Sequence, residues 1–207
     1  MLKVVLRELR EHAPFTFTGA VIGILVAIFL RNVPEKVTFN LFYIFHPAHV
    51  LLSAFITASM YKLHKSKPNI FKVFIVGLVG SIGVATLSDS LIPFLGETLL
   101  KLPHRELHLG FIEKWYIVNP IAILGITLAN IKPFTKFPHS AHVFVSTSAS
   151  LLHIMMSLGT VVLTIFLSFE IVILLFLAVW VPCCFSDIVF PLLFVSDEDK
   201  KQCRCCN

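Results

Sequence analysis

The sequence predicts an all-α polytopic membrane protein, with six transmembrane helices arranged as two inverted three-helix repeats. Three observations predict this fold. The chain of 207 residues is 57% apolar and only 14% charged, whereas a soluble domain carries about 25% charged residues. Six apolar runs are each long enough to cross the roughly 30 Å hydrocarbon core. Two short motifs in the first half of the chain return in the second half.

The spans are expected as helices, because a segment inside a bilayer has to satisfy its own backbone hydrogen bonds. Residues 1–13 are amphipathic and are expected as an interfacial helix or as a polar N-terminal extension of the first span. The first repeat covers 14–100, with spans at 14–30, 40–62 and 70–96. An extracytoplasmic loop follows at 101–112. The second repeat covers 113–196, with spans at 113–131, 139–165 and 170–195, and a Cys-rich cytoplasmic tail follows at 197–207.

The distribution of positive charge predicts the orientation in the membrane. Twelve of the 17 Lys and Arg residues lie on the side that holds both predicted termini. The positive-inside rule therefore places both termini in the cytoplasm, in an integral protein of the cell membrane. The net charge of +5 reflects this bias, and since no basic–aromatic stripe accompanies it, the expected partner is the lipid bilayer and not a nucleic acid. A homodimer is a further expectation for so small a membrane protein.

Two repeated motifs carry the candidate chemistry. The stretch "HPAHVLLS" at 46–53 returns as "HSAHVFVS" at 139–146, sharing the pattern H-x-A-H-V-x-x-S. The stretch "SDSLIP" at 88–93 returns as "SDIVFP" at 186–191, sharing S-D-x-x-x-P. Each half then has three spans, and because three is odd, the second half enters the membrane from the opposite side. Inverted repeats of this kind are typical of secondary transporters.

The repeated residues point to a metal site. Two histidines at i and i+3 share one helix face, and antiparallel packing would bring an Asp from the following span beside them. Imidazole and carboxylate ligands suit zinc, manganese, iron or nickel. The predicted metal ligands are His46, His49, Asp89, His139, His142 and Asp187. The matched hydroxyls predicted to support them are Ser53, Ser88, Ser146 and Ser186.

The same residues allow other interpretations. The His and Asp residues could tie the two halves together through helix–helix hydrogen bonds, and the serines could serve close helix packing. The sequence leaves open whether the two sets form one composite site or two. Centring each span in the bilayer puts the sets on opposite sides of the midplane, so convergence would require helices broken at prolines. The candidate break points are Pro47, Pro93, Pro138, Pro182 and Pro191.

Cysteines and two further histidines add candidates outside the repeat. Cys183 and Cys184 precede Asp187 and could lend a thiolate to the site or act as small apolar residues. The tail residues Cys203, Cys205 and Cys206 could capture a metal ion or be palmitoylated. His104 and His108, spaced i, i+4 in the expected loop, could gather metal or form a solvated pair.

These features together predict a membrane transporter for a divalent transition-metal ion, whose His and Asp groups could also exchange protons. A membrane-embedded metal-dependent enzyme of the hydrolase class is the alternative, because catalytic zinc keeps a position open for water. Transport is favoured over catalysis because both repeated sets are intact. A b-type haem electron carrier is a weaker alternative, since it leaves both aspartates without a role.

Overall fold

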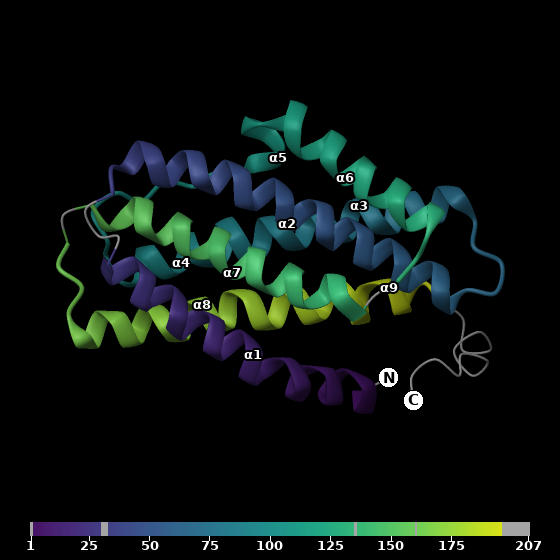
Figure 1. Cartoon of the computed structure of the whole chain (residues 1–207), viewed down its shortest axis with the longest axis horizontal. Coiled ribbons are helices and arrows are strands. Elements are labelled where there is room, and N and C mark those ends of the chain that lie inside the picture. The colour runs from purple at the N-terminus through teal and green to yellow at the C-terminus, as the bar shows by residue number, and fades with distance from the viewer. Residues whose placement is uncertain (1, 30–32, 135, 160, 196–207) are drawn as a thin grey trace.

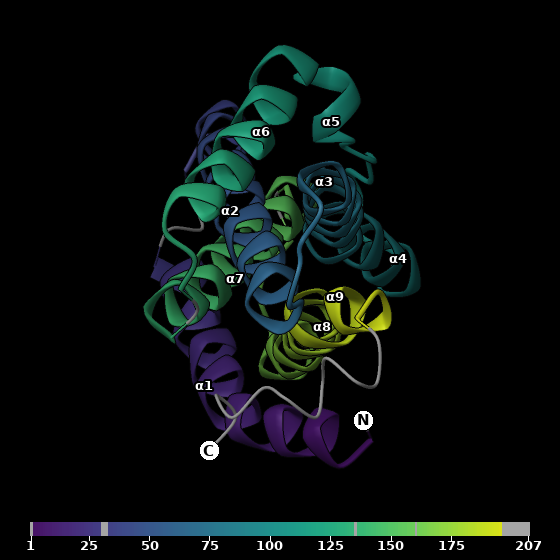
Figure 2. The ribbon, with the colours of Figure 1, turned by 90° about the vertical axis from the view of Figure 1, so that its right-hand side faces the viewer.

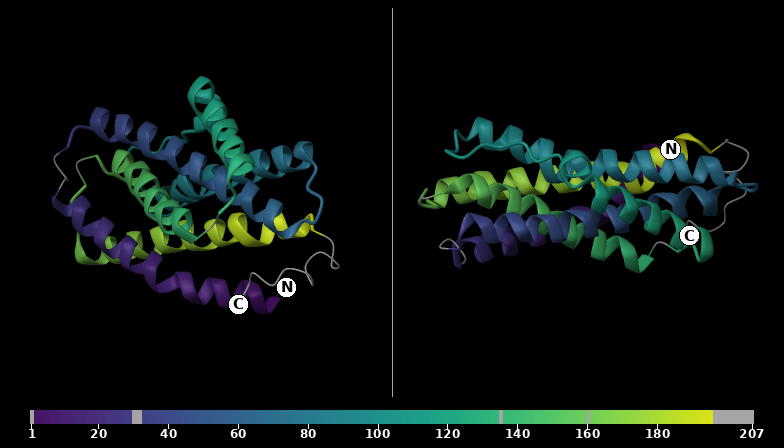
Figure 3. Two further views of the ribbon diagram at one scale, coloured as in Figure 1. Left: turned by 45° about the vertical axis from the view of Figure 1, so that its right-hand side comes forward. Right: turned by 90° about the horizontal axis from the view of Figure 1, so that it is seen from above.

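The computed structural model describes residues 2–29, 33–134, 136–159 and 161–195, with the side chains of 2–9, 11, 12, 15, 136–140, 184 and 188 outside that description. The described chain is helical, and its long helices lie roughly along the length of the molecule (Figures 1 and 3). The first half consists of α1 (Leu2–Phe29), α2 (Glu35–His64), α3 (Ile70–Thr86), the π-helical turn η1 (Leu87–Leu91) and α4 (Ile92–Leu99). The second half consists of α5 (Gly110–Glu113), α6 (Trp115–Ile131), α7 (Lys136–Leu158), α8 (Ile165–Cys184), the π-helical turn η2 (Phe185–Val189) and α9 (Phe190–Leu193).

Length and composition make this a helical membrane protein. Within the described residues, four helical runs are long and apolar enough to cross a bilayer: Glu35–His64, Ile70–Leu99, Ala141–Leu158 and Ile165–Leu193. Two shorter apolar helices, Thr16–Phe29 and Trp115–Ile131, correspond to the first and fourth predicted spans. Large apolar side chains such as Phe29, Ile131 and Ile165 are strongly exposed, as expected of a surface that faces lipid.

Helices α2 and α7 occupy the middle of the bundle (Figure 2). Helix α2 packs against α3, α6 and α7, while α7 packs against α1, α2 and α8. One buried apolar core gathers residues of α2, α3, α6 and α9 around Ile56 and Ile126. A second core gathers residues of α1, α7 and α8 around Ile154 and Leu175. The two helices that carry the His motifs, α2 and α7, therefore each pack against at least three other helices.

The N-terminal segment continues directly into the first span. Helix α1 runs without interruption from Leu2 to Phe29 and contains Pro14. Residues 1–13 therefore share one helix with 14–29, in the manner of the N-terminal extension that the sequence offered as an alternative. Most side chains of this segment lie outside the described set, so its amphipathic face stays a prediction.

The fifth and sixth spans begin and end earlier than the sequence indicated. Helix α7 ends at Leu158, before the predicted end at 165, because Gly159 has the left-handed φ of 54° that stops a helix. Helix α8 begins at Ile165, before the predicted start at 170, where the Thr164 side chain accepts a hydrogen bond from Leu167 N–H. The residues between them form the turn between these two helices.

Both Ser-Asp motifs lie in π-helical turns. η1 holds Ser88 and Asp89, and η2 holds Ser186 and Asp187. A proline follows each turn at the start of the next helix, Pro93 in α4 and Pro191 in α9. Because proline has no N–H, it interrupts the regular ladder, and the extra residue of a π turn is one way to absorb that interruption. The helix therefore continues through each proline, with a π turn before it, and does not end there.

Candidate metal centre

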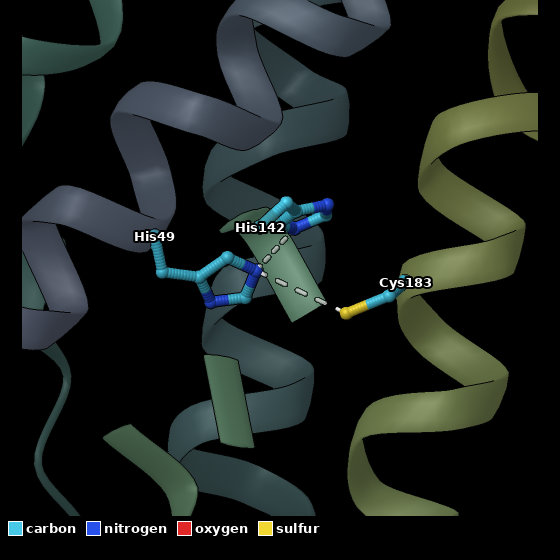
Figure 4. A group of neighbouring side chains, drawn as sticks. All are labelled: His49, His142 and Cys183. Carbon is cyan, nitrogen blue, oxygen red and sulfur yellow. Dashed lines mark hydrogen bonds between the residues drawn. The ribbon is translucent and has the colours of Figure 1, made fainter. Parts of the chain in front are cut away.

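Three buried side chains converge at the centre of the bundle. His49 of α2, His142 of α7 and Cys183 of α8 present ligand atoms that all lie within 4.8 Å of one another (Figure 4). His49 Nε2 is 2.5 Å from His142 Nε2 and 4.0 Å from Cys183 Sγ. All three residues are at most 1% exposed. This group, called the central triad below, offers the N and S ligands that zinc prefers.

Each triad histidine is held by a carboxylate at its other ring nitrogen. His49 Nδ1 lies 2.7 Å from Asp89 Oδ2, and His142 Nδ1 lies 2.9 Å from Asp187 Oδ2. An ionised carboxylate only accepts hydrogen bonds, so both Nδ1 atoms carry the hydrogen and both Nε2 atoms are directed at the triad. Carboxylates support metal-binding histidines in this same way in many proteins.

Asp89 has no spare acceptor capacity in this arrangement. Its Oδ2 takes hydrogen bonds from His49 and also from His46, whose Nδ1 lies 3.0 Å away. Its Oδ1 accepts from Ser88 at 2.6 Å and from Ser146 at 3.2 Å. A carboxylate offers about four acceptor positions, and here all four are used. The geometry therefore places Asp89 as an orienting group for the histidines.

With both aspartates ionised, the contact between the two Nε2 atoms requires a positive charge. Each ring already carries a hydrogen at Nδ1, so two neutral rings would oppose two lone pairs at 2.5 Å. A proton or a metal ion between the nitrogens removes this repulsion. Two nitrogens bound to one zinc ion lie about 3.3 Å apart, given Zn–N bonds of about 2.05 Å in a tetrahedral site. The rings need to separate by less than about 1 Å to admit the ion.

His49 and His142 converge although their helices α2 and α7 are continuous, so these two helices are not broken at a proline as the sequence predicted. Pro47 lies inside α2, which is continuous from Glu35 to His64. Because this helix begins before the expected position 40, His49 lies at its middle and not near its end. Pro182 is likewise inside α8. Of the remaining predicted break points, Pro138 is among the residues whose side chains are not described.

Hydroxyl groups join the two halves on either side of the triad. Ser53 Oγ lies 3.2 Å from Ser186 Oγ, and the matched residue Ser146 lies 3.4 Å from Ser88 Oγ. Cys183 Sγ is also 3.5 Å from Ser146 Oγ. The four predicted supporting serines therefore all contact the other half of the chain.

Two further hydroxyls join the two halves at positions that the repeated motifs do not include. Thr57 Oγ1 lies 3.4 Å from the Ser186 carbonyl oxygen, and Ser150 Oγ lies 2.9 Å from the Ser88 carbonyl oxygen. Thr57 and Ser150 are separated by the same 93 residues as the two His motifs, and each follows its motif serine by four residues. Extending the repeat by one helical turn would have found them.

The remaining predicted residues lie at different places. His46 is buried between Asp89 and Gly110. Its Nδ1 bonds to Asp89, and its Nε2 lies so close to Gly110 that a Cβ added to this glycine would be 2.5 Å away. His139, Cys184, Cys203, Cys205 and Cys206 lie outside the described residues or side chains. His104 and His108 lie apart from the triad, at the loop end of the bundle, where they line a small cavity.

Comparison with protein families, with curated proteins and with solved structures finds no match to this chain. The chain is a helical membrane protein with a buried cluster of His, Cys and Asp whose central triad could hold a metal ion.

Proposed function

We propose that this protein carries a divalent transition-metal ion across the membrane and exchanges it for protons. The observation that carries the proposal is the contact between His49 Nε2 and His142 Nε2, which joins the two central helices through a position that needs a cation. A site assembled from two halves at the middle of the bundle is what an alternating-access carrier requires.

We further propose that the chain consists of two inverted three-helix units. The supporting observation is that matched residues make matched contacts. Exchanging 53 for 146, 57 for 150 and 88 for 186 converts the hydroxyl contacts of one half into those of the other. The helix contacts follow the same exchange: α1 packs on α7 and α8, while α6 packs on α2 and α3. The His49–His142 contact lies where the two halves meet.

In this proposal the central triad binds the ion directly. His49 and His142 give imidazole nitrogens, and Cys183 gives a sulfur, a set that favours zinc over manganese, which prefers oxygen ligands. Asp89 and Asp187 hold the imidazoles in the ligand tautomer. His46 shares Asp89 and so helps to fix its position. The roles predicted for the two aspartates thus change from ligand to orienting group.

Proton exchange follows from the charge at the site. Before the ion binds, a proton between the two Nε2 atoms supplies the required positive charge. A metal ion that takes this position displaces that proton and also the proton of the Cys183 thiol, since thiolate is the ligand form. The arriving charge of a divalent ion is then matched by protons leaving, which keeps the net charge of the buried site nearly constant.

A membrane-embedded metal-dependent hydrolase is the second candidate. Three protein ligands around a tetrahedral ion leave one position for water, as in catalytic zinc sites. A hydrolase also needs substrate to reach that water, whereas every triad side chain is at most 1% exposed. The closed site favours the carrier, because a carrier passes through a state in which its ion is enclosed.

Zinc uptake into proteoliposomes tests the proposal. Vesicles holding the full-length protein and a zinc-sensitive dye are given external zinc with and without a pH gradient. We expect uptake that depends on the gradient and is lost in His142→Ala and Cys183→Ala. His64→Ala is the matched control, because His64 is a buried histidine on α2 that bonds to the Met60 carbonyl, away from the triad.

Two results would contradict the proposal, and they reject different parts of it. Uptake no faster than in empty vesicles, together with tight zinc binding in detergent, would reject transport and favour the enzyme. A purified protein that binds no zinc, manganese, iron or nickel at the triad would reject the metal site itself.

A further inference from the structure

A second buried pair of ionisable residues lies apart from the central triad. Glu97 of α4 is fully buried, and His153 of α7 is 1% exposed. His153 Nδ1 lies 2.7 Å from Glu97 Oε1. Neither residue belongs to the repeated motifs. Burying such a pair is costly unless its remaining polar atoms are also satisfied.

Two atoms of this pair have no hydrogen-bond partner among the described residues: His153 Nε2 and Glu97 Oε2. An ionised Glu97 accepts the Nδ1 hydrogen, so Nε2 of a neutral His153 carries a lone pair. A buried polar atom left unsatisfied costs about 1–3 kcal/mol. The arrangement repeats that of the central triad, where a carboxylate holds Nδ1 and directs Nε2 at the ligand position.

Both residues line a cavity of about 30 Å³ at the loop end of the bundle. That is enough room for a small ion or a water molecule. The other ionisable residues that line it are Glu35, His104, Glu106 and His108. The segment that carries the last three is fixed near α7, since His104 N–H donates to the Ser157 carbonyl at 3.2 Å. The rings of His108 and His153 have centroids 5.5 Å apart.

The aromatic ring of Phe42 separates this cavity from the central network. Phe42 is fully buried. It stacks on His46 with a centroid distance of 5.3 Å and meets His153 edge-on at 5.5 Å. A ligand at His153 would therefore occupy a position distinct from the triad, nearer the loop end of the molecule.

We propose that Glu97 and His153 form an outer site for a second divalent transition-metal ion. His153 Nε2 is its buried ligand, and Glu97 holds Nδ1 of the same ring, as the aspartates do at the triad. His104, Glu106 and His108, which line the same cavity from the loop, can complete the coordination. The set contains nitrogen and oxygen but no sulfur, which suits zinc or cobalt. This inference goes beyond the proposed transport and does not depend on it, because it concerns binding alone.

Cobalt(II) titration of the detergent-purified full-length chain tests the outer site. The background carries Cys203→Ser, Cys205→Ser and Cys206→Ser, so that the tail supplies no thiolate. A thiolate bound to cobalt gives a sulfur-to-metal charge-transfer band, which reports the triad through Cys183, whereas the outer site gives none. We expect two equivalents of cobalt, of which one produces the band.

The variants separate the two sites. His153→Gln should remove one equivalent, and Glu97→Gln should weaken its binding about 10–100-fold. Both should leave the charge-transfer band intact. Cys183→Ala should remove the band and leave the other equivalent. His64→Gln, a buried histidine outside both sites, should change neither the count nor the band. A single cobalt without the band, lost in His153→Gln, would support the outer site while rejecting the triad.

The inference is overturned if the parent binds one cobalt that produces the band, if it binds none, if His153→Gln leaves the count unchanged, or if Glu97→Gln leaves the affinity of the second equivalent unchanged. Should a variant fail to give a monodisperse preparation, zinc X-ray absorption on the background protein decides. About one sulfur for every two zinc ions supports two filled sites, and about one sulfur for each zinc ion places all bound metal at the triad.

Discussion

The hydroxyl of Ser150 lies 2.9 Å from the backbone carbonyl oxygen of Ser88, which belongs to the π turn of the opposite half. In that turn Ile92 N–H bonds to the carbonyl of Leu87, five residues before it. In the same register the donor for Ser88 would be Pro93, which has no N–H. Ser150 Oγ is also 2.9 Å from the Ser146 carbonyl oxygen of its own helix, so its one hydroxyl hydrogen is shared between the two carbonyls and supplies part of the hydrogen bonding that the proline cannot. Thr57 stands in the same relation to Ser186, five residues before Pro191.

Ser150→Ala should destabilise the protein by about 1–3 kcal/mol, because it leaves the buried Ser88 carbonyl without this donor. The free energy of unfolding can be measured by titration with a denaturing detergent. Ser148→Ala is the control, since Ser148 lies two residues away and bonds only within its own helix, to the Phe144 carbonyl. Equal stability of the two variants would contradict the role given to Ser150.

The sequence predicts much of this site because the chemistry is duplicated. The two copies of H-x-A-H-V-x-x-S and S-D-x-x-x-P identify His49, His142, Asp89 and Asp187 as a set. The proximity of Asp to His then follows from antiparallel packing. Which of these residues would bind the ion and which would orient a ligand could not be predicted, since that depends on which ring nitrogen faces the carboxylate. That orientation is set by side-chain contacts in three dimensions.

Residues outside the repeated motifs are harder to identify as functional from the sequence. Cys183 corresponds to Ala85 in the first half, so the repeat gives it no support, and its place in the triad depends on how α8 packs. Glu97 and His153 are 56 residues apart and belong to no motif. The apolar pattern predicts too late an end for α7, because it continues past Gly159, whose left-handed backbone conformation ends the helix.

Asp89→Asn should lower zinc affinity about 10–100-fold, the usual cost of losing a carboxylate that orients a metal-binding histidine. The amide keeps one acceptor oxygen but turns an NH₂ group toward hydrogens of His46, His49 or the serines. Competition with a chromophoric chelator measures the affinity. Glu170→Gln makes the same carboxylate-to-amide change on α8 outside the cluster, and it should bind zinc as the parent does. An unchanged affinity in Asp89→Asn would remove Asp89 from the site.

Gly125→Ala should destabilise the contact between α2 and α6. A Cβ at this position would lie 2.5 Å from the Leu51 carbonyl oxygen and 3.0 Å from the Ala54 Cβ. The helices would have to separate, and overpacking of this kind costs about 1–3 kcal/mol. Gly83→Ala is the matched control, because a Cβ there meets nothing within 4 Å. It should be neutral or up to about 1 kcal/mol more stable, since alanine favours helix over glycine. Loss of stability in both variants would point to the glycines' flexibility and not to close packing.

The contact between Tyr43 and Glu113 ties the short helix α5 to α2 and should make stability depend on pH. Tyr43 Oη donates a hydrogen bond to Glu113, and Leu109 N–H donates another at 3.0 Å. Partial burial opposes the charge on Glu113, but these hydrogen bonds and His108 outweigh it and hold the pKa of Glu113 below its ordinary value. Because the folded-state pKa is depressed, the contribution to stability is present above the unfolded value of about 4.3 and is lost as pH falls through the folded pKa.

Tyr43→Phe should therefore move the pKa of Glu113 back up, and part of the stability difference between variant and parent should vanish in acid. Thermal unfolding of the purified protein from neutral pH to about pH 3 measures this, with the difference in midpoint largest above the ordinary Glu pKa of about 4.3. Glu113→Gln removes the titrating group and should flatten the same pH dependence. Tyr116→Phe is the control, since Tyr116 is 55% exposed on the neighbouring helix α6. A difference between Tyr43→Phe and the parent that stays constant across this pH range would mean that Tyr43 acts through packing alone.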